Sequence, residues 1–71
     1  MKILVTGAAG FIGSALIENL SSISNVKVVG MVRSLAGLNI VNDVEYRVGE
    51  IGGPKKIDIN LSDIDIVIHT A

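Results

Sequence analysis

Cysteine and tryptophan are absent from the chain, and proline, histidine, phenylalanine and tyrosine occur once each. Without cysteine, neither a disulfide framework nor a thiolate metal site can form. The single histidine, His69, has no cluster of acidic residues at ligand spacing around it, so we predict no metal site. Hydrophobic residues make up 49% of the chain and aromatic residues 3%. The core must therefore be aliphatic, which is typical of parallel sheets covered by helices.

Strong charge of one sign is also missing. Six Lys and Arg against seven Asp and Glu give a formal net charge of -1, and the basic residues are scattered along the chain. This pattern predicts no nucleic-acid or anionic-membrane surface. The apolar runs are shorter than the roughly 20 residues that a membrane span needs, and residues 3–5 are too few for a secretory signal. We therefore predict no membrane span and a cytoplasmic location.

The apolar runs that are present predict strands and one helix. Residues 3–5 and 26–32 have the β-branched composition of strands buried on both faces. Further strands are expected at 44–48 and, also buried, within 63–71. Apolar residues at three- and four-residue steps predict an amphipathic helix over 11 to about 22, with a core-facing stripe of Ile12, Ala15, Leu16, Leu20 and Ile23. Residues 34–43 are expected to form a loop or a short irregular helix.

The order of these elements predicts the fold class. A strand, helix and strand in succession form a right-handed parallel crossover. Continued in doubly wound fashion, the β-α-β-β-β order gives an α/β sheet of the Rossmann type with strand order 3-2-1-4. Strand 4 would then be an uncovered apolar edge, and edges of this kind invite aggregation. We therefore expect residues 1–71 to be the truncated, N-terminal part of a larger fold.

Three glycines stand at even spacing where the first strand gives way to the helix, in "TGAAGFIG". The first, Gly7, permits a sharp turn; Gly10 lets backbone approach a phosphate; Gly13 allows the helix to pack closely on the strand. The amides and dipole at the helix start favour an anion at the same place. The context predicts a dinucleotide pyrophosphate site. A mononucleotide phosphate loop is excluded because no lysine precedes Ser14.

The stretch "VTGAAGFIGSALIENL" resembles the opening of the extended short-chain dehydrogenase/reductase family, which contains NAD(P)-dependent sugar epimerases and dehydratases. Two later stretches, "VGEI" at 48–51 and "DIVIHTA" at 65–71, resemble that family's third and fourth strand ends. The spacing between them is most similar to members described as UDP-glucose 4-epimerases. The resemblance implies an NAD(P)-binding Rossmann domain over 1–71, with the substrate domain absent.

The resemblance also implies roles for individual residues. The three glycines would approach the pyrophosphate, with the amides of Phe11 and Ile12 donating to it. Glu50 and Ile51 stand where the family contacts adenine, although the family has Asp where this chain has Glu. The strand-4 end would pass the ribose and nicotinamide side of the cofactor, mostly through shape and backbone contacts of His69, Thr70 and Ala71.

The end of the second strand predicts which cofactor is preferred. An acidic residue there binds a ribose 2′-hydroxyl, whereas an arginine can hold a 2′-phosphate. This chain has Val32 at that place, followed by Arg33 and Ser34, and no acidic residue between Glu18 and Asp43. We therefore predict that NADP or NAD is bound, with NADP favoured by the Arg33 guanidinium and helped by Ser34.

No catalytic residue is predicted in the chain. The family's base is the tyrosine of a Tyr-x-x-x-Lys pair, but Glu50 stands four residues after Tyr46. We therefore expect the 71 residues alone to be inactive. By resemblance the complete protein would be a nucleotide-sugar epimerase, an isomerase that uses transient hydride transfer. It would also be expected to form a homodimer. A reductase or dehydratase of the same superfamily, and a non-catalytic NADP-binding sensor, remain alternatives.

Overall fold

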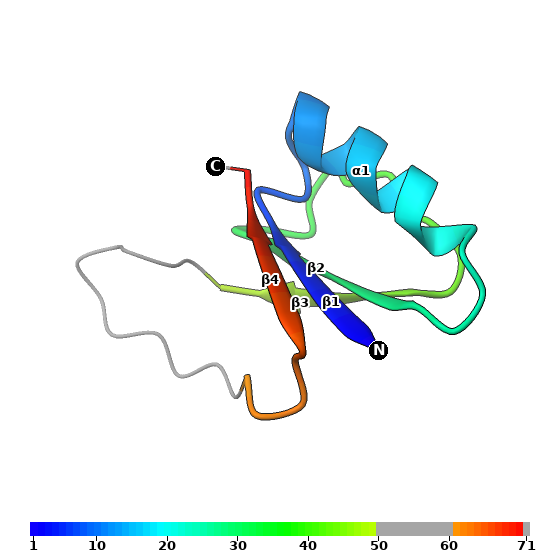
Figure 1. The fold of residues 1–71 in the computed structure, drawn as a ribbon. Coiled ribbons are helices and arrows are strands. Elements are labelled where there is room, and N and C mark those ends of the chain that lie inside the picture. Colours follow the sequence, from blue (N-terminus) through cyan, green and yellow to red (C-terminus); the bar gives the residue numbers. More distant parts are fainter. Residues whose placement is uncertain (50–60, 71) are drawn as a thin grey trace.

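The computed structural model describes residues 1–49 and 61–70. In chain order these residues form β1 (Lys2–Thr6), α1 (Phe11–Ser21), β2 (Lys27–Val32), β3 (Val44–Val48) and β4 (Ile66–His69). The strands make one parallel sheet in the order β3-β2-β1-β4 (Figure 1). The predicted α/β class and strand order are therefore confirmed. The predicted loop at 34–43 contains no helix.

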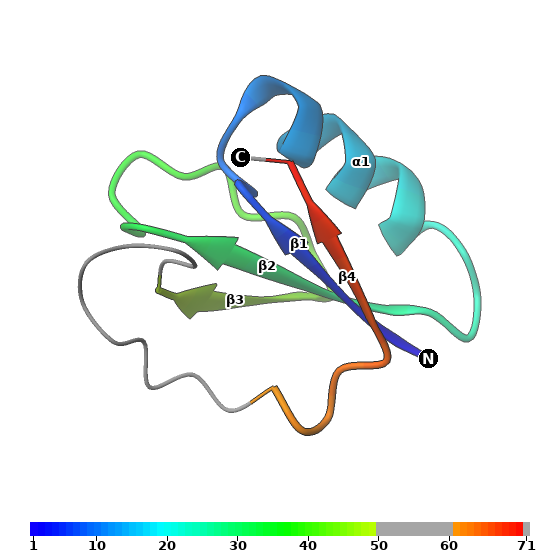
Figure 2. The same ribbon diagram turned by 60° about the vertical axis from the view of Figure 1, so that its left-hand side comes forward.

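The two central strands carry most of the buried side chains. Because successive side chains of a strand point to opposite faces, β1 and β2 each contribute to two apolar clusters. On the α1 side these strands bury Ile3, Val5, Val28 and Val32. On the opposite side they bury Leu4, Val29 and Met31, against which Leu61 and Ile64 pack. Figure 2 shows α1 lying along one side of this sheet only.

The predicted core-facing stripe of the helix is wrong in part. Gly13 and Ile17 are the buried residues of α1, whereas Ile12 is 66% exposed and Ile23 lies beyond the helix with 49% exposed. Ala15 is exposed as well, and Leu16 and Leu20 are half-buried. The reason is that the helix approaches the sheet through Gly13, a residue that hydropathy does not count. This contact turns the face that carries Gly13 and the Ile17 side chain inward and leaves Ile12 outside.

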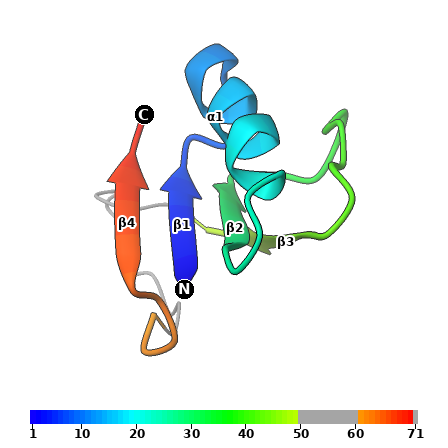
Figure 3. The same cartoon turned by 45° about the vertical axis from the view of Figure 1, so that its right-hand side comes forward.

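The prediction that the fourth strand is buried is also wrong. In β4, Ile66 is 41% and Val67 48% exposed. The strand lies at the edge of the sheet and pairs with β1, while α1 packs over β1 and β2 (Figure 3). The apolar edge expected from the strand order is therefore present in the described part of the chain.

Charged side chains tie the segment before β4 to the face of the sheet that α1 leaves open. Asp63 accepts two hydrogen bonds from the Arg47 guanidinium, at 2.8 and 3.2 Å, and one from Lys2 Nζ at 2.7 Å. Arg47 also pairs with Glu45. The hydrogen bonds from Arg47, and then from Lys2, hold the pKa of the Asp63 carboxyl well below its usual range. Asp63 thus links β1 and β3 across the sheet.

Candidate functional site

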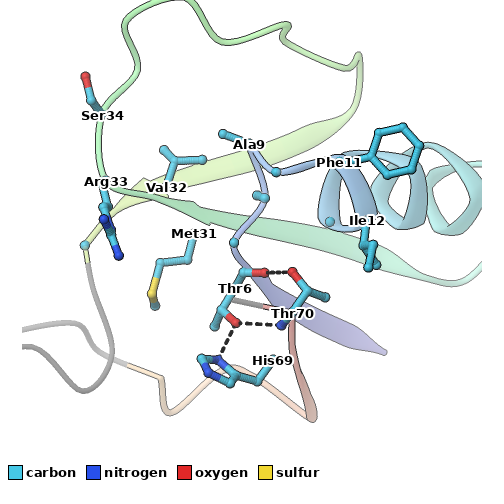
Figure 4. A pocket seen from close by; sticks show the side chains of 15 residues that line it. Thr6, Ala9, Phe11, Ile12, Met31, Val32, Arg33, Ser34, His69 and Thr70 are labelled. Carbon is cyan, nitrogen blue, oxygen red and sulfur yellow. Dashed lines mark hydrogen bonds between the residues drawn. The ribbon is translucent and has the colours of Figure 1, made fainter.

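A cavity of about 470 Å³ opens at the carboxyl ends of β1, β2 and β4 (Figure 4). In parallel α/β sheets, ligands bind at this edge, at the point where the strand order reverses. Here that point is β1, between β2 and β4. The predicted site residues in the described part of the chain all line this cavity: Gly7, Gly10, Phe11, Ile12, Gly13, Arg33, Ser34 and Thr70. Glu50, Ile51 and Ala71 lie outside the described residues.

The loop between β1 and α1 is built around the carbonyl of Gly7. Gly7 has φ 64, a left-handed conformation that favours glycine, and its carbonyl accepts a hydrogen bond from the Gly10 amide at 3.0 Å. A Cβ at Gly13 would lie 2.1 Å from the same carbonyl oxygen. Only a residue without a side chain fits there, so the helix start is held directly against the strand end.

The first turn of α1 faces the cavity with unpaired donors. Gly10 is the N-cap and provides no side-chain cap, and no acidic residue stands in the first turn. The first intrahelical bond runs from the Ser14 amide to the Gly10 carbonyl, at 2.9 Å. The amides of Phe11, Ile12 and Gly13 precede it and have no intrahelical acceptor. Together with the helix dipole, these amides suit an anionic group of a ligand.

Thr6, which the sequence reasoning missed, joins β1 to β4 at the cavity wall. Its side-chain oxygen lies 2.6 Å from His69 Nδ1 and accepts a hydrogen bond from the Thr70 amide at 3.2 Å. The Thr70 hydroxyl in turn donates to the Thr6 carbonyl at 2.6 Å. Figure 4 shows these three side chains gathered below the glycine loop. No local pattern in the sequence could have identified Thr6, because its partners lie 63 and 64 residues away.

Arg33 and Ser34 follow β2 directly and line the opposite side of the cavity from His69 and Thr70 (Figure 4). Both residues are exposed. Ser34 Oγ accepts a hydrogen bond from the Ala36 amide at 3.1 Å, which shapes the loop after β2. The strand end is further fixed because the Met31 carbonyl accepts from the Ala8 amide at 3.2 Å. Arg33 and the glycine loop therefore line the same cavity, and the predicted role of Arg33 toward a cofactor stays a prediction.

Tyr46 has a structural position rather than a site position. Its hydroxyl accepts a hydrogen bond from the Val41 amide at 3.1 Å, and its ring packs over Gly30, where a Cβ would lie 3.0 Å from ring carbons. It does not line the cavity. Within residues 1–49 and 61–70, no group of three or more His, Cys, Asp and Glu side chains is placed to hold a metal ion. No helix in this part of the chain is long and apolar enough to cross a membrane.

A sequence model of the NAD dependent epimerase/dehydratase family matches residues 3–71. The chain belongs to this family. Membership confirms the predicted superfamily and implies a nicotinamide dinucleotide cofactor. The cavity fits such a group, because Gly7, Gly10 and Gly13 bring bare backbone to its wall and because the helix start offers unpaired amides with no acidic residue beside them.

Individual proteins of yeast and pea are also similar to this chain. An uncharacterized protein of Schizosaccharomyces pombe is 39% identical over 74 residues, covering 100% of this chain and 24% of that protein. A UDP-glucose 4-epimerase of Pisum sativum is 33% identical over 84 residues, covering 99% of this chain and 24% of the enzyme. A bifunctional UDP-glucose and UDP-xylose 4-epimerase of the same plant matches with 33% identity over the same shares. The chain thus spans about a quarter of these relatives' length. No solved structure matches.

Proposed function

We propose that residues 1–71 are the N-terminal, dinucleotide-binding part of a nucleotide-sugar 4-epimerase. The observation that carries the proposal is the cavity at the carboxyl ends of β1, β2 and β4, where the glycine loop and the uncapped start of α1 meet. The pea UDP-glucose 4-epimerases, 33% identical to this chain, support the choice of activity within the family. The substrate domain, the catalytic tyrosine and lysine, and a homodimer of the complete protein belong to the same proposal.

In this proposal the chain binds and orients the cofactor. The amides of Phe11, Ile12 and Gly13 would donate to the pyrophosphate, and the adenine contacts of Glu50 and Ile51 stay a prediction. When bound, the nicotinamide would supply reversible hydride acceptance from a sugar carbon. The remaining contribution of these residues is to fix the distance and orientation at which that exchange becomes fast.

The proposal includes a preference for NADP(H) over NAD(H). Arg33 stands at the cavity wall directly after β2, where a guanidinium can bind a 2′-phosphate with two parallel hydrogen bonds. A carboxylate at this place would repel that phosphate, but residues 32–34 are Val, Arg and Ser and contain no carboxylate. Ser34 adds a hydroxyl on the same side of the cavity.

Titration of the chain with NADPH and NADH, followed by cofactor fluorescence, tests both parts of the proposal. We expect NADPH to bind more tightly, and Arg33→Ala to weaken NADPH about tenfold, or about 1.4 kcal/mol, with little change for NADH. Lys27→Ala is the matched control, because it removes one positive charge at the other end of β2. Tighter binding of NADH that Arg33→Ala leaves unchanged would contradict the preference. Absence of binding to either would contradict the site itself.

A further inference from the structure

The Thr6 hydroxyl is a buried polar group with three neighbours. Thr6 is 3% exposed. Its oxygen lies 2.6 Å from His69 Nδ1, 3.2 Å from the Thr70 amide nitrogen and 3.5 Å from the Ile68 carbonyl oxygen. All three partners come from β4 or the residue that follows it. The hydroxyl therefore contacts the histidine ring directly.

A hydroxyl has one proton and two lone pairs. The Thr70 amide can only donate, so it occupies one lone pair of the Thr6 oxygen. The hydroxyl proton must then go to His69 Nδ1 or to the Ile68 carbonyl. A separation of 3.5 Å is beyond the usual range of about 2.5 to 3.0 Å for O–H···O bonds, whereas 2.6 Å is a short contact. These distances favour the Thr6 hydroxyl as donor and Nδ1 as acceptor over the alternative, in which Nδ1–H donates to Thr6 and Thr6 donates to the Ile68 carbonyl.

An accepting Nδ1 fixes the state of the ring. A neutral imidazole carries its proton on one nitrogen only, so His69 must carry it on Nε2. His69 lines the cavity and its side chain is exposed. Across residues 1–49 and 61–70, Nε2 has no hydrogen-bond partner. The Nε2–H group is thus the polar end that the ring offers to a ligand.

We propose that Thr6 is a positioning residue that locks His69 in its Nε2–H form, and that this N–H donates to an acceptor oxygen of the dinucleotide, on a phosphate or a ribose. The identity of the ligand rests on the proposed function; the state of the ring does not. The opposite form would turn a lone pair toward the same oxygens and repel them. His69, at the end of β4, would therefore add a side-chain hydrogen-bond donor to the backbone amide donors at the start of α1.

The state of the ring can be measured without any ligand, because His69 is the only histidine. We expect nitrogen-15 NMR of the chain, above the pH at which histidine is charged, to show a pyridine-type Nδ1 and a pyrrole-type Nε2 as a single form. Thr6→Ser keeps the hydroxyl and should keep this pattern. Thr6→Val has the same shape without the hydroxyl and should shift the Nδ1 signal and admit the second form. A protonated Nδ1 in the unmodified chain, or an unchanged Nδ1 signal in a folded Thr6→Val, would overturn the assignment.

The donor role is tested by titrating NADH into His69→Gln and His69→Leu. A glutamine amide can replace the Nε2–H group, so we expect binding within about threefold of the unmodified chain, and about tenfold weaker binding for His69→Leu. Equal binding of NADH by His69→Leu and the unmodified chain would overturn the donor role while leaving the proposed function intact. Failure of the unmodified chain to bind NADH would overturn both, and the NMR result would still stand.

A parallel titration with ADP assigns the acceptor. If His69→Leu weakens ADP as much as NADH, the oxygen lies in the adenosine diphosphate half of the dinucleotide. If His69→Leu weakens NADH alone, the oxygen lies on the nicotinamide side. Both results support the donor role and differ only in where the accepting oxygen is.

Discussion

At the scale of single residues, the carbonyl of Gly7 organises the candidate site. It receives the Gly10 amide at 3.0 Å, and the Cα of Gly13 lies so close that a Cβ there would come within 2.1 Å of its oxygen. At Gly10 the corresponding distance would be 3.2 Å. The two positions look alike in the sequence, but they differ in how much room the backbone leaves.

This difference gives a prediction for two alanine variants. Gly13→Ala places a methyl group 2.1 Å from the Gly7 carbonyl oxygen, an overlap too large for a small backbone shift to relieve, so we expect a loss of about 3 kcal/mol, at the upper end of overpacking costs, or failure to fold. Gly10→Ala should cost below about 1 kcal/mol, because a shift of a few tenths of an ångström relieves its contact. Urea unfolding followed by circular dichroism measures both. Equal midpoints for the two variants would contradict this account of the loop.

The side-chain roles at this scale were harder to predict from the sequence than the glycines. A glycine after a strand and before a helix indicates a close backbone approach from local order alone. Thr6 gains its role from partners that lie 63 and 64 residues away. No local pattern contains that information, so the sequence predicted a mostly steric part for the strand-4 end.

At the scale of elements, the ion pairs of Asp63 join segments that the sheet alone does not connect. Asp63 is bound to Arg47 of β3 and to Lys2 of β1, and the Lys2 amide donates to Asp65 at 2.8 Å. Glu45 and Arg47 lie in register with Val29 and Met31. The charged cluster therefore lies beside the apolar cluster on the face away from α1, and it fixes the turn that leads into β4.

The low pKa of Asp63 predicts how stability depends on pH. A carboxyl whose pKa is lower in the folded state contributes stability that is complete above its unfolded pKa, about 3.9, and is lost as pH falls toward the folded value. We expect Asp63→Asn to lower the urea midpoint at pH 7, and the gap to the unmodified chain to narrow between pH 5 and pH 2.

Asp43→Asn is the control for this experiment. Asp43 is exposed and has φ 66, a conformation that asparagine also tolerates. The Asp43→Asn substitution removes the same charge without breaking an ion pair. The urea midpoint of this variant should therefore follow that of the unmodified chain across the pH range. A gap for Asp63→Asn that stays constant from pH 7 to pH 2 would show that the ion pairs do not cause it.

Element order was predictable, and element orientation was not. Apolar runs and turn residues located the strands, because a strand buried in a parallel sheet is apolar on both faces. The burial of β4 was overestimated from the same rule, since a run such as Ile66–Ile68 is equally apolar at an edge and in the centre. The face of α1 was misplaced because Gly13, which packs against the Gly7 carbonyl just after β1, has no side chain to count.

At the scale of the whole molecule, the sheet is protected unevenly. Helix α1 covers β1 and β2, while β4 has β1 on one side and exposed Ile66 and Val67. An apolar edge strand is a template for pairing with another chain, and a lysine on such an edge opposes that pairing. The exposed edge of β4, rather than the charged surface residues, should therefore determine how one copy of the chain associates with another.

We expect Val67→Lys to reduce concentration-dependent self-association of the chain. Ile40→Lys is the matched control, because Ile40 is 61% exposed but lies outside the strands. Sedimentation velocity over a range of concentrations measures the effect. Association that both lysine variants reduce equally would point to general charge repulsion and contradict the role of the β4 edge.

The bond between Thr6 and Thr70 joins residues 64 positions apart. Closing so long a loop carries an entropic cost, and contacts of this kind slow folding. The cavity therefore cannot form from neighbouring residues alone. The glycine turn and the start of α1 can form early, but the opposite wall forms only when β4 pairs with β1. During synthesis the ribosome must release residues 69 and 70 before this wall of the cavity can form.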